Sequence, residues 1–174
     1  QCRQTICGAD YGLIDDMTLE PTPDYWASVL WKRLMGPKVL RATPLGAPAT
    51  LRVYAHRWDA SGVIGAGTEP STTFLAINLG NETVELEMLN AGAPVILSPS
   101  AAQLMLIART RSTGDARGVE SWLLEGAASD ARECNINGVR AVTSRDGRVP
   151  DFPPVMESRP RVPGGAAIFL RTIA

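Results

Sequence analysis

Histidine and cysteine, which most metal and nucleophilic sites require, are scarce in this sequence. Its 174 residues contain one histidine, His56, and three cysteines, Cys2, Cys7 and Cys134. The cysteines have no metal-ligand spacing, and one histidine cannot complete a Cys/His zinc site. We therefore expect no metal and no other cofactor. An odd number of cysteines permits at most one disulfide within the chain, so we expect buried thiols, or thiols whose partners lie outside this sequence.

Long apolar runs and an excess of one charge are also lacking. The 17 basic and 18 acidic side chains give a net charge of -1, which offers no electrostatic case for a nucleic-acid or membrane-surface partner. The longest apolar runs, such as residues 166–170, are too short to cross a bilayer. The chain starts at Gln1 instead of Met, which we interpret as a truncation, so the lack of a signal peptide does not argue against secretion.

The first 36 residues have the pattern of a strand, a loop and a helix. Residues 3–8 are partly apolar and end in glycine, which is typical of a strand that runs into a loop. A helix is predicted over residues 23–35, with Thr22 as its N-cap and Pro23 at its first position. Gly36 and the proline after it end the helix. Apolar residues four apart give the helix one apolar face: Trp26, Leu30 and Leu34.

From residue 37 onward the apolar pattern changes to a period of two, which is typical of strands. Strands are predicted over residues 51–56, 73–79, 84–88, 95–97, 104–108, 121–124, 139–143 and 166–172. Gly80 and Asn81 are predicted to form a hairpin turn between the second and third of these strands. Many short strands separated by turn signals favour an antiparallel β-sandwich or barrel. We therefore expect a boundary between residues 1–36 and 37–174.

No residue has the setting of a catalytic group. Of the nine Asp and nine Glu, only Asp15 and Asp16 are adjacent, and we interpret them as solvated loop acids. His56 lies in the middle of a predicted strand and no Gly-x-Ser-x-Gly motif is present, so a serine hydrolase is not supported. The glycines of residues 114–118 have no phosphate-binding lysine. We predict no catalytic residue in this chain.

Two features suggest contact with carbohydrate. Asn81 begins an Asn-x-Thr sequon in a predicted turn, which makes it a candidate glycosylation site. Tyr11 follows a predicted strand in a loop, where binding residues concentrate, although it can equally serve to pack that loop. Trp26 and Trp31 fall at helical positions and are predicted to pack.

Several blocks in the first ninety residues carry a resemblance to a known family. They are GADYGLID at residues 8–15, PTPDYW at 21–26, LWKRLMG at 30–36, LRVYAH at 51–56 and LAINLGNET at 75–83. In order, spacing and type these blocks resemble the heparanase family, glycoside hydrolase family 79, and in detail its plant and algal heparanase-like members. The resemblance is weak over residues 91–160, apart from Asn137-Gly138, and returns at 166–170.

This resemblance implies a fold and an activity. Members of the family have a (β/α)8 barrel followed by a C-terminal β-sandwich. Residues 1–36 would be the last strand-loop-helix of the barrel and residues 37–174 the antiparallel β-sandwich, so the chain would be mainly β. The activity implied is that of a retaining endo-β-glucuronidase that hydrolyses glucuronate-bearing polysaccharide or proteoglycan glycans. Both catalytic glutamates would lie upstream of Gln1, so the chain itself would be inactive and its partner would be the upstream barrel of the same polypeptide.

The resemblance also implies a substrate-binding loop. Family members hold the glucuronate carboxylate through backbone amides, and this role falls on Ala9, Asp10 and Tyr11. The sequence departs from the family pattern at two of these positions. Ala9 stands where the family usually has glycine, and Asp10 stands where it usually has asparagine. A carboxylate on Asp10 would repel a uronate that it faced. The sandwich disulfide of the animal enzyme is not matched, since Arg57 stands at its first cysteine position.

Other functions remain open from the sequence. The chain could be a non-catalytic carbohydrate-binding or structural β-sandwich module, or an inactive regulator that occupies glycans without cleaving them. The resemblance implies a secretory-pathway location: extracellular, cell wall, lysosome or vacuole, including the membrane periphery. The sequence does not distinguish heparan sulfate from an arabinogalactan-type glycan. Because one barrel helix is present without its barrel, its apolar face is expected to lack partner strands.

Overall fold

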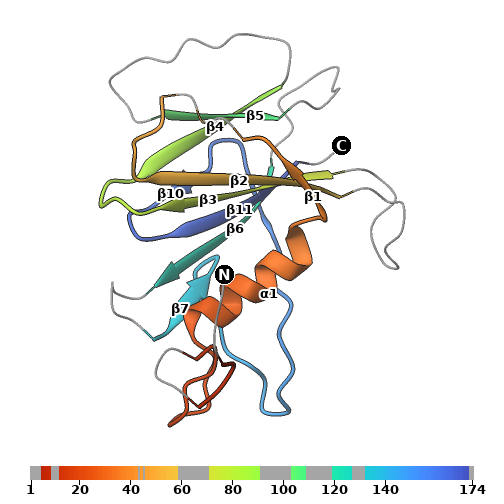
Figure 1. Cartoon of the computed structure of the whole chain (residues 1–174), viewed down its shortest axis with the longest axis vertical. Coiled ribbons are helices and arrows are strands. Elements are labelled where there is room, and N and C mark those ends of the chain that lie inside the picture. Colours follow the sequence, from red (N-terminus) through yellow and green to blue (C-terminus); the bar gives the residue numbers. More distant parts are fainter. Residues whose placement is uncertain are drawn as a thin grey trace.

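The computed structural model describes residues 5–8, 12–42, 44, 46–58, 71–90, 103–108, 119–126 and 132–172. In these residues one helix and two sheets form three layers (Figure 1). The helix packs on one face of a large sheet, and a small sheet packs on the other face. The prediction of a mainly β chain is confirmed. In the described residues, no helix is long and apolar enough to cross a membrane.

The helix α1 (Pro23–Leu34) begins at the predicted proline and ends one residue before its predicted end. The amide of Met35 donates to the carbonyl of Trp31 at 2.9 Å and closes the last turn. Thr22 occupies the predicted N-cap position, but its side chain makes no capping hydrogen bond. Its hydroxyl instead donates to the carbonyl of Leu13 at 3.0 Å. The Thr22 hydroxyl thus bonds to the loop before the helix instead of capping the helix.

The large sheet has eight strands, all paired antiparallel, in the order β1-β2-β3-β11-β6-β7-β8, with β9 also paired to β6. They are β1 (Lys38–Leu40), β2 (Leu51–Trp58), β3 (Ser71–Asn78), β6 (Val119–Gly126), β7 (Cys134–Ile136), β8 (Val139–Arg140), β9 (Val155–Glu157) and β11 (Ala167–Arg171). The small sheet has the order β10-β4-β5 and consists of β10 (Arg161–Val162), β4 (Val84–Asn90) and β5 (Gln103–Ala108). In this sheet β4 and β5 are parallel.

Most predicted strands are confirmed, and two predictions are wrong in extent. The strand predicted over 139–143 is limited to Val139–Arg140. Thr5–Gly8, the described part of the strand predicted over 3–8, forms bends. A strand needs a neighbouring strand as its hydrogen-bond partner. The carbonyl of Ile6 instead accepts a hydrogen bond from the amide of Ile14, at 2.8 Å, which belongs to the loop before α1. The strand predicted over 95–97 lies outside the described residues.

The predicted hairpin at Gly80 is a corner between the two sheets. β3 belongs to the large sheet and β4 to the small sheet, so the two strands are not paired. The buried side chain of Asn78 holds this corner. Its Nδ2 donates to the carbonyls of Glu82 at 2.7 Å and Val162 at 3.0 Å, and its Oδ1 accepts the amide of Gly80 at 3.0 Å. These side-chain hydrogen bonds stand in place of the backbone hydrogen bonds that would join β3 and β4 in a hairpin.

The apolar face of α1 is buried against the large sheet. Trp26 and Leu30 are each 1% exposed. They share a core with residues of β3, β6, β7 and β11 and of the loops beside them: Leu75, Trp122, Leu124, Cys134, Ile136, Ala141, Phe152 and Phe169. The expectation that this face lacks partner strands is therefore wrong. The sheet covers it because alternate residues of β3 and β11 point toward the helix.

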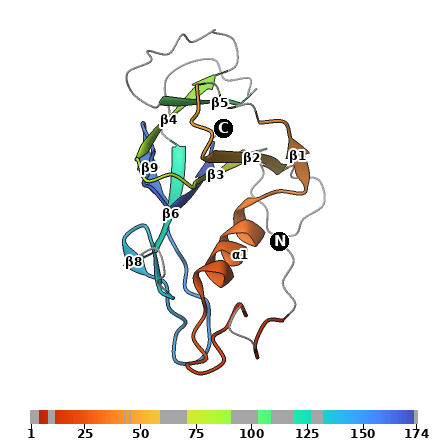
Figure 2. The ribbon, with the colours of Figure 1, turned by 60° about the vertical axis from the view of Figure 1, so that its left-hand side comes forward.

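The opposite face of the large sheet carries a second core. Phe74, Ala76, Ile168 and Leu170 pack there, together with residues of the small sheet such as Leu86. Figure 2 shows the small sheet and the helix on opposite sides of the large one. The loop before α1 and the segment after β8 both reach the end of the molecule farthest from the small sheet (Figures 1 and 2). The candidate site lies at this end.

Candidate functional site

The three residues predicted to bind substrate, Ala9, Asp10 and Tyr11, lie outside the described residues. Their flanks, residues 5–8 and 12–22, are described. The amide of Ile14 donates to the carbonyl of Ile6 at 2.8 Å, so the two flanks meet at the base of the predicted binding loop. This hydrogen bond joins the two described flanks to each other.

The second flank is attached to the start of α1. The amide and the hydroxyl of Thr22 both donate to the carbonyl of Leu13, at 2.9 and 3.0 Å. Ile14 and Pro21 form an isolated antiparallel bridge beside these bonds. Residues 13–22 therefore form a closed turn that lies directly against the helix, whose position is in turn set by its core against the sheet.

The side chain of Asp15 organises this turn. Asp15 is 7% exposed, and its Oδ1 accepts the amides of Met17 and Thr18 at 3.0 and 2.8 Å and the hydroxyl of Thr18 at 3.1 Å. Its Oδ2 accepts a hydrogen bond within an ion pair with Arg132. The expectation that Asp15 is a solvated loop acid is wrong, whereas Asp16 is exposed as expected. Both oxygens of a buried carboxylate must be satisfied, and here they are.

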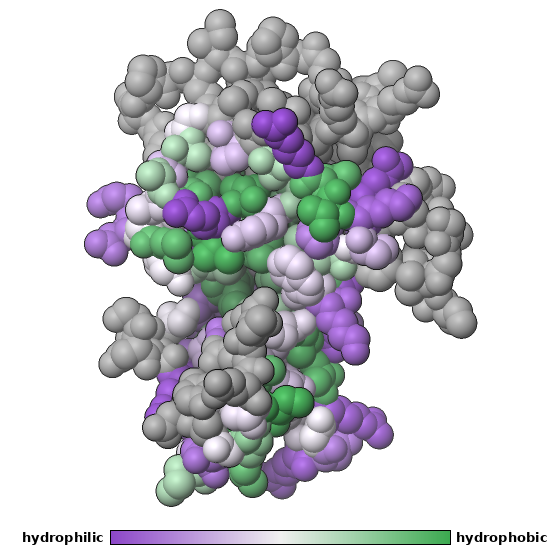
Figure 3. Space-filling view, viewed as in Figure 1, coloured by the Kyte–Doolittle hydropathy of each residue, from purple (hydrophilic) through white to green (hydrophobic). Residues whose placement is uncertain are grey.

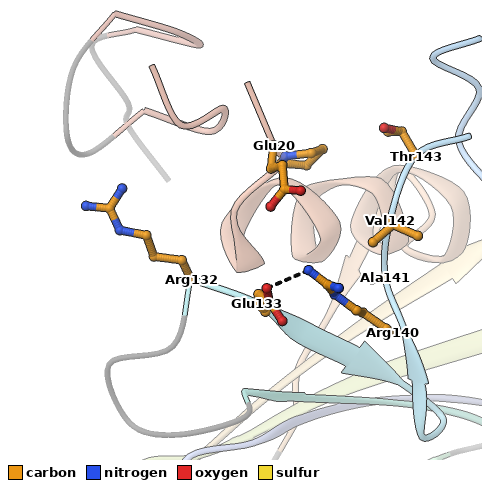
Figure 4. A pocket seen from close by; sticks show the side chains of 8 residues that line it. Glu20, Arg132, Glu133, Arg140, Ala141, Val142 and Thr143 are labelled. Carbon is orange, nitrogen blue, oxygen red and sulfur yellow. Dashed lines mark hydrogen bonds and ion pairs between the residues drawn. The ribbon is translucent and has the colours of Figure 1, made fainter. Parts of the chain in front are cut away.

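A shallow hollow of about 80 Å³ lies beside this turn. It is lined by Glu20, Pro21, Arg132, Glu133, Arg140, Ala141, Val142 and Thr143. Glu133 and Arg140 form an ion pair across it at 2.5 Å, and each side chain is about half exposed, at 54% and 53%. Figure 4 shows the Arg132 side chain directed away from this pair. Because Arg140 pairs with Glu133, the hollow does not present two free carboxylates to a ligand.

Other candidate groups have structural roles. The Nδ1 of His56 lies 2.6 Å from the carbonyl of Gly36, and its ring packs edge-on against Trp31.

Cys134 is a buried free thiol whose pKa is raised to about 11 by burial, and Cys7 is exposed and free. Cys2 lies outside the described residues. Among the residues described, no three His, Cys, Asp or Glu side chains are grouped to hold a metal ion.

Asn81 lies exposed at the corner between the two sheets. Its backbone is closely packed, because a Cβ added at Gly164 would lie 2.6 Å from the Asn81 carbonyl. Asn81 is thus an exposed residue whose backbone is closely packed.

The surface near β1 combines apolar and charged residues. Val39 is 76% exposed, and Trp31 and Tyr54 are partly exposed nearby. Val39 pairs with His56 across the strands, and His56 contacts Trp31, so these side chains are neighbours. Figure 3 shows apolar surface beside β1, flanked by hydrophilic side chains.

Comparison with known proteins defines the class of this chain. No family model matches it. A glycoside hydrolase family 30 xylanase from Clostridium acetobutylicum has a similar structure over 96% of this chain and 32% of its own, with a TM-score of 0.50 and 14% identity. At that identity the likeness concerns the fold alone.

The sequence comparisons are more specific. The chain is 31% identical over 169 residues to heparanase-like protein 1 of Arabidopsis thaliana, which covers 90% of this chain and 30% of that relative. It is 47% identical over 55 residues to the baicalin β-D-glucuronidase of Scutellaria baicalensis, which covers 32% of this chain and 10% of the relative. The chain thus resembles members of the heparanase family over most of its length. It spans less than a third of the length of these relatives.

Proposed function

We propose that this chain is the C-terminal part of a retaining endo-β-glucuronidase that hydrolyses glucuronate-bearing polysaccharide or proteoglycan glycans. The observation that carries the proposal is the match over 90% of the chain to a heparanase-like protein, joined by the shorter match to a β-D-glucuronidase. Residues 1–36 would complete the catalytic barrel, and residues 37–174 would form the β-sandwich domain beside it.

The catalytic carboxylates are assigned to the remainder of the polypeptide. Retaining glycosidases place two carboxyl groups about 5–5.5 Å apart on either side of the scissile bond. In the described part of the chain, Asp15 is occupied by the turn and by Arg132, and Glu133 is paired with Arg140. Neither is free to act as an acid or a nucleophile. The family resemblance assigns both catalytic glutamates to sequence upstream of Gln1, and on this basis we propose that the chain by itself has no glycosidase activity.

The contribution of this chain to the site would be the loop that includes Ala9, Asp10 and Tyr11. Backbone amides bind a carboxylate without carrying a formal charge, and they act best when they are held in place beforehand. The described flanks supply such a frame. Gly8 enters the loop with φ 91°, a conformation that favours glycine, and Ile14 closes it on Ile6.

The exposed sequon supports a secretory-pathway location. N-linked glycans are added to Asn-x-Thr sequences of proteins in that pathway. Asn81 is exposed at a surface corner, where a glycan would not collide with the core. We therefore propose that Asn81 carries a glycan. We also propose that the protein is located outside the cell, in the cell wall or in the lysosome or vacuole.

The proposed activity is tested with the intact polypeptide and two chromogenic substrates that share one leaving group. The β-glucuronide should be hydrolysed with a kcat/KM at least about a hundredfold above that of the β-glucoside, because an unmatched charged group forfeits several kcal/mol. Equal rates on both substrates, or hydrolysis of the glucoside only, would contradict the proposal.

A further inference from the structure

We infer that the edge of the large sheet at β1 and β2, together with the end of α1, binds a linear acidic polysaccharide. This surface holds the sugar polymer without cleaving it, through the carboxylate or sulfate groups that the polymer carries. We call it the β1 edge, and its central residues are Trp31, Lys32, Val39, Arg41, Arg52 and Tyr54. The inference does not rest on the proposed hydrolase activity, because it concerns a different surface and a different property.

Positive charge is concentrated in the part of the sequence that builds the β1 edge. Residues 25–58 contain six of the 17 basic residues and none of the 18 acidic ones, although the whole chain has a net charge of -1. The six are all exposed: Lys32, Arg33, Lys38, Arg41, Arg52 and Arg57. The fold keeps them together, because these residues form α1, β1 and β2, and β1 pairs with β2. A local excess of one sign attracts a ligand of the opposite charge.

Arg52 is held in position without losing its charge. Its guanidinium donates to the backbone carbonyls of Ala49 and Leu51, the second at 3.2 Å. Carbonyls do not neutralise a cation, and a guanidinium has five N–H donors, so donors remain for a carboxylate or a sulfate. Six arginines of residues 132–172 differ, because carboxylates already pair with them: Arg132, Arg140, Arg148, Arg159, Arg161 and Arg171.

Exposed apolar and aromatic side chains lie among these charges. Val39 is 76% exposed, Tyr54 46% and Trp31 39%. Val39 pairs with His56 across the strands, and Tyr54 and Arg52 alternate with it along β2, so all of these side chains share one face. The Trp31 ring contacts the His56 ring from α1, with centroids 5.1 Å apart. Figure 1 shows the end of α1 beside β1, and Figure 3 shows the apolar surface there with hydrophilic side chains around it.

This combination fits an acidic sugar polymer. The C–H faces of sugar rings pack on exposed aromatic and aliphatic side chains, while carboxylates or sulfates along the polymer accept charge-assisted hydrogen bonds from Lys and Arg. Apolar patches with a polar rim on a protein surface commonly mark such interaction sites. One face of the β1 edge therefore offers both kinds of contact that a glycan of this class requires.

Two other polyanions fit the β1 edge less well. A peripheral membrane site needs an apolar stripe that enters the bilayer, whereas Val39 and Tyr54 lie within sheet strands with Arg52 on the same face. A nucleic-acid strand carries a charge about every 3.4 Å, and the acidic remainder of the chain repels so dense a polyanion. A glycan with one acidic group per sugar or per disaccharide is less densely charged and matches a few spaced cations.

The test measures binding of the intact polypeptide to polygalacturonate, an α-linked uronate polymer that a β-glucuronidase does not cleave. The variant Lys32→Ala/Arg41→Ala/Arg52→Ala removes three cations from the β1 edge. The matched control, Arg140→Ala/Arg148→Ala/Arg159→Ala, removes three exposed arginines that pair with carboxylates elsewhere. We expect Kd to rise about tenfold or more in the first variant and by less than about twofold in the control, because exposed ion pairs of about twofold to fivefold each act together.

Salt and conservative substitutions separate the two kinds of contact. The loss in the first variant should shrink at high salt, which screens exposed charges. Tyr54→Ala should weaken binding about threefold to tenfold at every salt concentration, because it removes packing and no charge. Lys32→Arg/Arg41→Lys/Arg52→Lys keeps the charges and should bind as the wild type does, which shows that the alanine variant fails by charge and not by misfolding.

The ligand class is decided with four further probes: methyl-esterified polygalacturonate, dextran sulfate, a single-stranded oligonucleotide and vesicles that contain phosphatidylserine. Loss of binding to the ester supports the inference, and tighter binding to dextran sulfate than to polygalacturonate supports it with sulfate as the preferred group. Equal binding to the ester, or tighter binding to the oligonucleotide or the vesicles than to either acidic polymer, would overturn it.

Equal weakening in the two triple-alanine variants, or an unchanged Kd in the first, would also overturn the inference, because binding would then not depend on the β1 edge. Hydrolysis of a small chromogenic β-glucuronide is measured on the same samples and should be equal in all variants. A wild type that binds the polymer but hydrolyses no glucuronide would contradict the proposed function and leave this inference intact. A wild type that hydrolyses the glucuronide but binds neither acidic polymer would do the reverse.

Discussion

Single polar side chains hold the irregular parts of this fold in place. Asn137 is the clearest case, with φ 51° in a conformation that asparagine tolerates better than most residues. Its Oδ1 accepts the amide of Leu123 at 2.8 Å, and its Nδ2 donates to the carbonyls of Ser121 and Pro153, both at 3.1 Å. One amide thus joins β6 to two other segments. Asn78 at the corner between the sheets and Asp15 in the turn before α1 act in the same manner.

At this scale the sequence predicted residue types better than their partners. The sequon at Asn81 and the packing role of Trp26 were readable, because each depends on local sequence. The role of Asp15 was missed, although its spacing from Thr18 is typical of an aspartate that accepts bonds from its own turn. Arg132 could not be found, because nothing in the sequence links two residues 117 positions apart.

Asn78→Ala should strongly destabilise the chain. The substitution removes three hydrogen bonds and leaves two carbonyls and one amide without their partner at a buried corner. We expect a loss of about 2–4 kcal/mol in the free energy of unfolding, measured by urea denaturation. The control is Glu82→Ala, which keeps the carbonyl that Asn78 bonds and should change stability by less than about 0.5 kcal/mol. Equal losses in the two variants would contradict this role.

Asn81→Gln should remove one glycan and leave the fold intact. When the chain is made in a eukaryotic secretory host, the wild type should lose mass on enzymatic removal of N-glycans, and the variant should not. Asn81 is exposed, so thermal melting of the two deglycosylated proteins should coincide within about 2 °C. A wild-type mass equal to that of the bare polypeptide would refute the assignment.

Cys134 should stay unmodified in the folded chain while Cys7 reacts. Burial raises the pKa of the Cys134 thiol to about 11, so the reactive thiolate is scarce at pH 8, and the group is also inaccessible. Alkylation followed by peptide mapping checks this, and rapid native labelling of Cys134 would disprove it.

The raised pKa of Cys134 also makes stability depend on pH. Between about pH 9 and 11 the folded state keeps the thiol proton that the unfolded state has lost. The contribution to stability is therefore constant below about pH 9 and declines as pH rises toward 11.

Among the elements, local patterns identified the helix and most strands, and failed where the partner is distant in sequence. The bounds of α1 follow from Pro23 and from the stop at Gly36, both of which act locally. The turn after β3 was predicted as a hairpin because Gly80 and Asn81 allow one. Whether two consecutive strands pair or separate into two sheets depends on which faces they bury. Here the alternation of Val84 and Leu86 buries β4 in the second core, across from the large sheet.

Leu30→Ala should destabilise the helix and the large sheet together. Leu30 is 1% exposed in the core between α1 and the sheet, so its truncation leaves a cavity there. We expect a loss of about 2–5 kcal/mol in the free energy of unfolding. Lys32→Ala, an exposed position on the same helix, should cost less than about 0.5 kcal/mol. Hydrogen exchange adds a second check, because the amides of α1 and β3 should be protected to similar degrees. Rapid exchange confined to the helix would show that the two are not packed as described.

For the molecule as a whole, the arrangement places the turn before α1 at one end and Asn81, the proposed glycosylation site, on the turn between the two sheets. The family and the mainly β fold were accessible from the sequence, the first through the blocks of residues 8–36 and 51–83. The packing of α1 on the sheet was not, because its apolar face is equally suited to a barrel. The contact depends on residues distant in sequence, because Leu75 of β3 and Phe169 of β11 both lie in the core that the sheet shares with α1.

The central claim is that both catalytic carboxylates lie outside these 174 residues in a retaining β-glucuronidase. An activated 2-deoxy-2-fluoro-β-glucuronide forms a long-lived glycosyl-enzyme with the nucleophile of such an enzyme. After reaction with the intact polypeptide and proteolysis, mass spectrometry should find the label on a glutamate in a peptide outside this sequence, and the chain by itself should remain unlabelled. A label on any of the nine Asp or nine Glu of this chain would contradict the account.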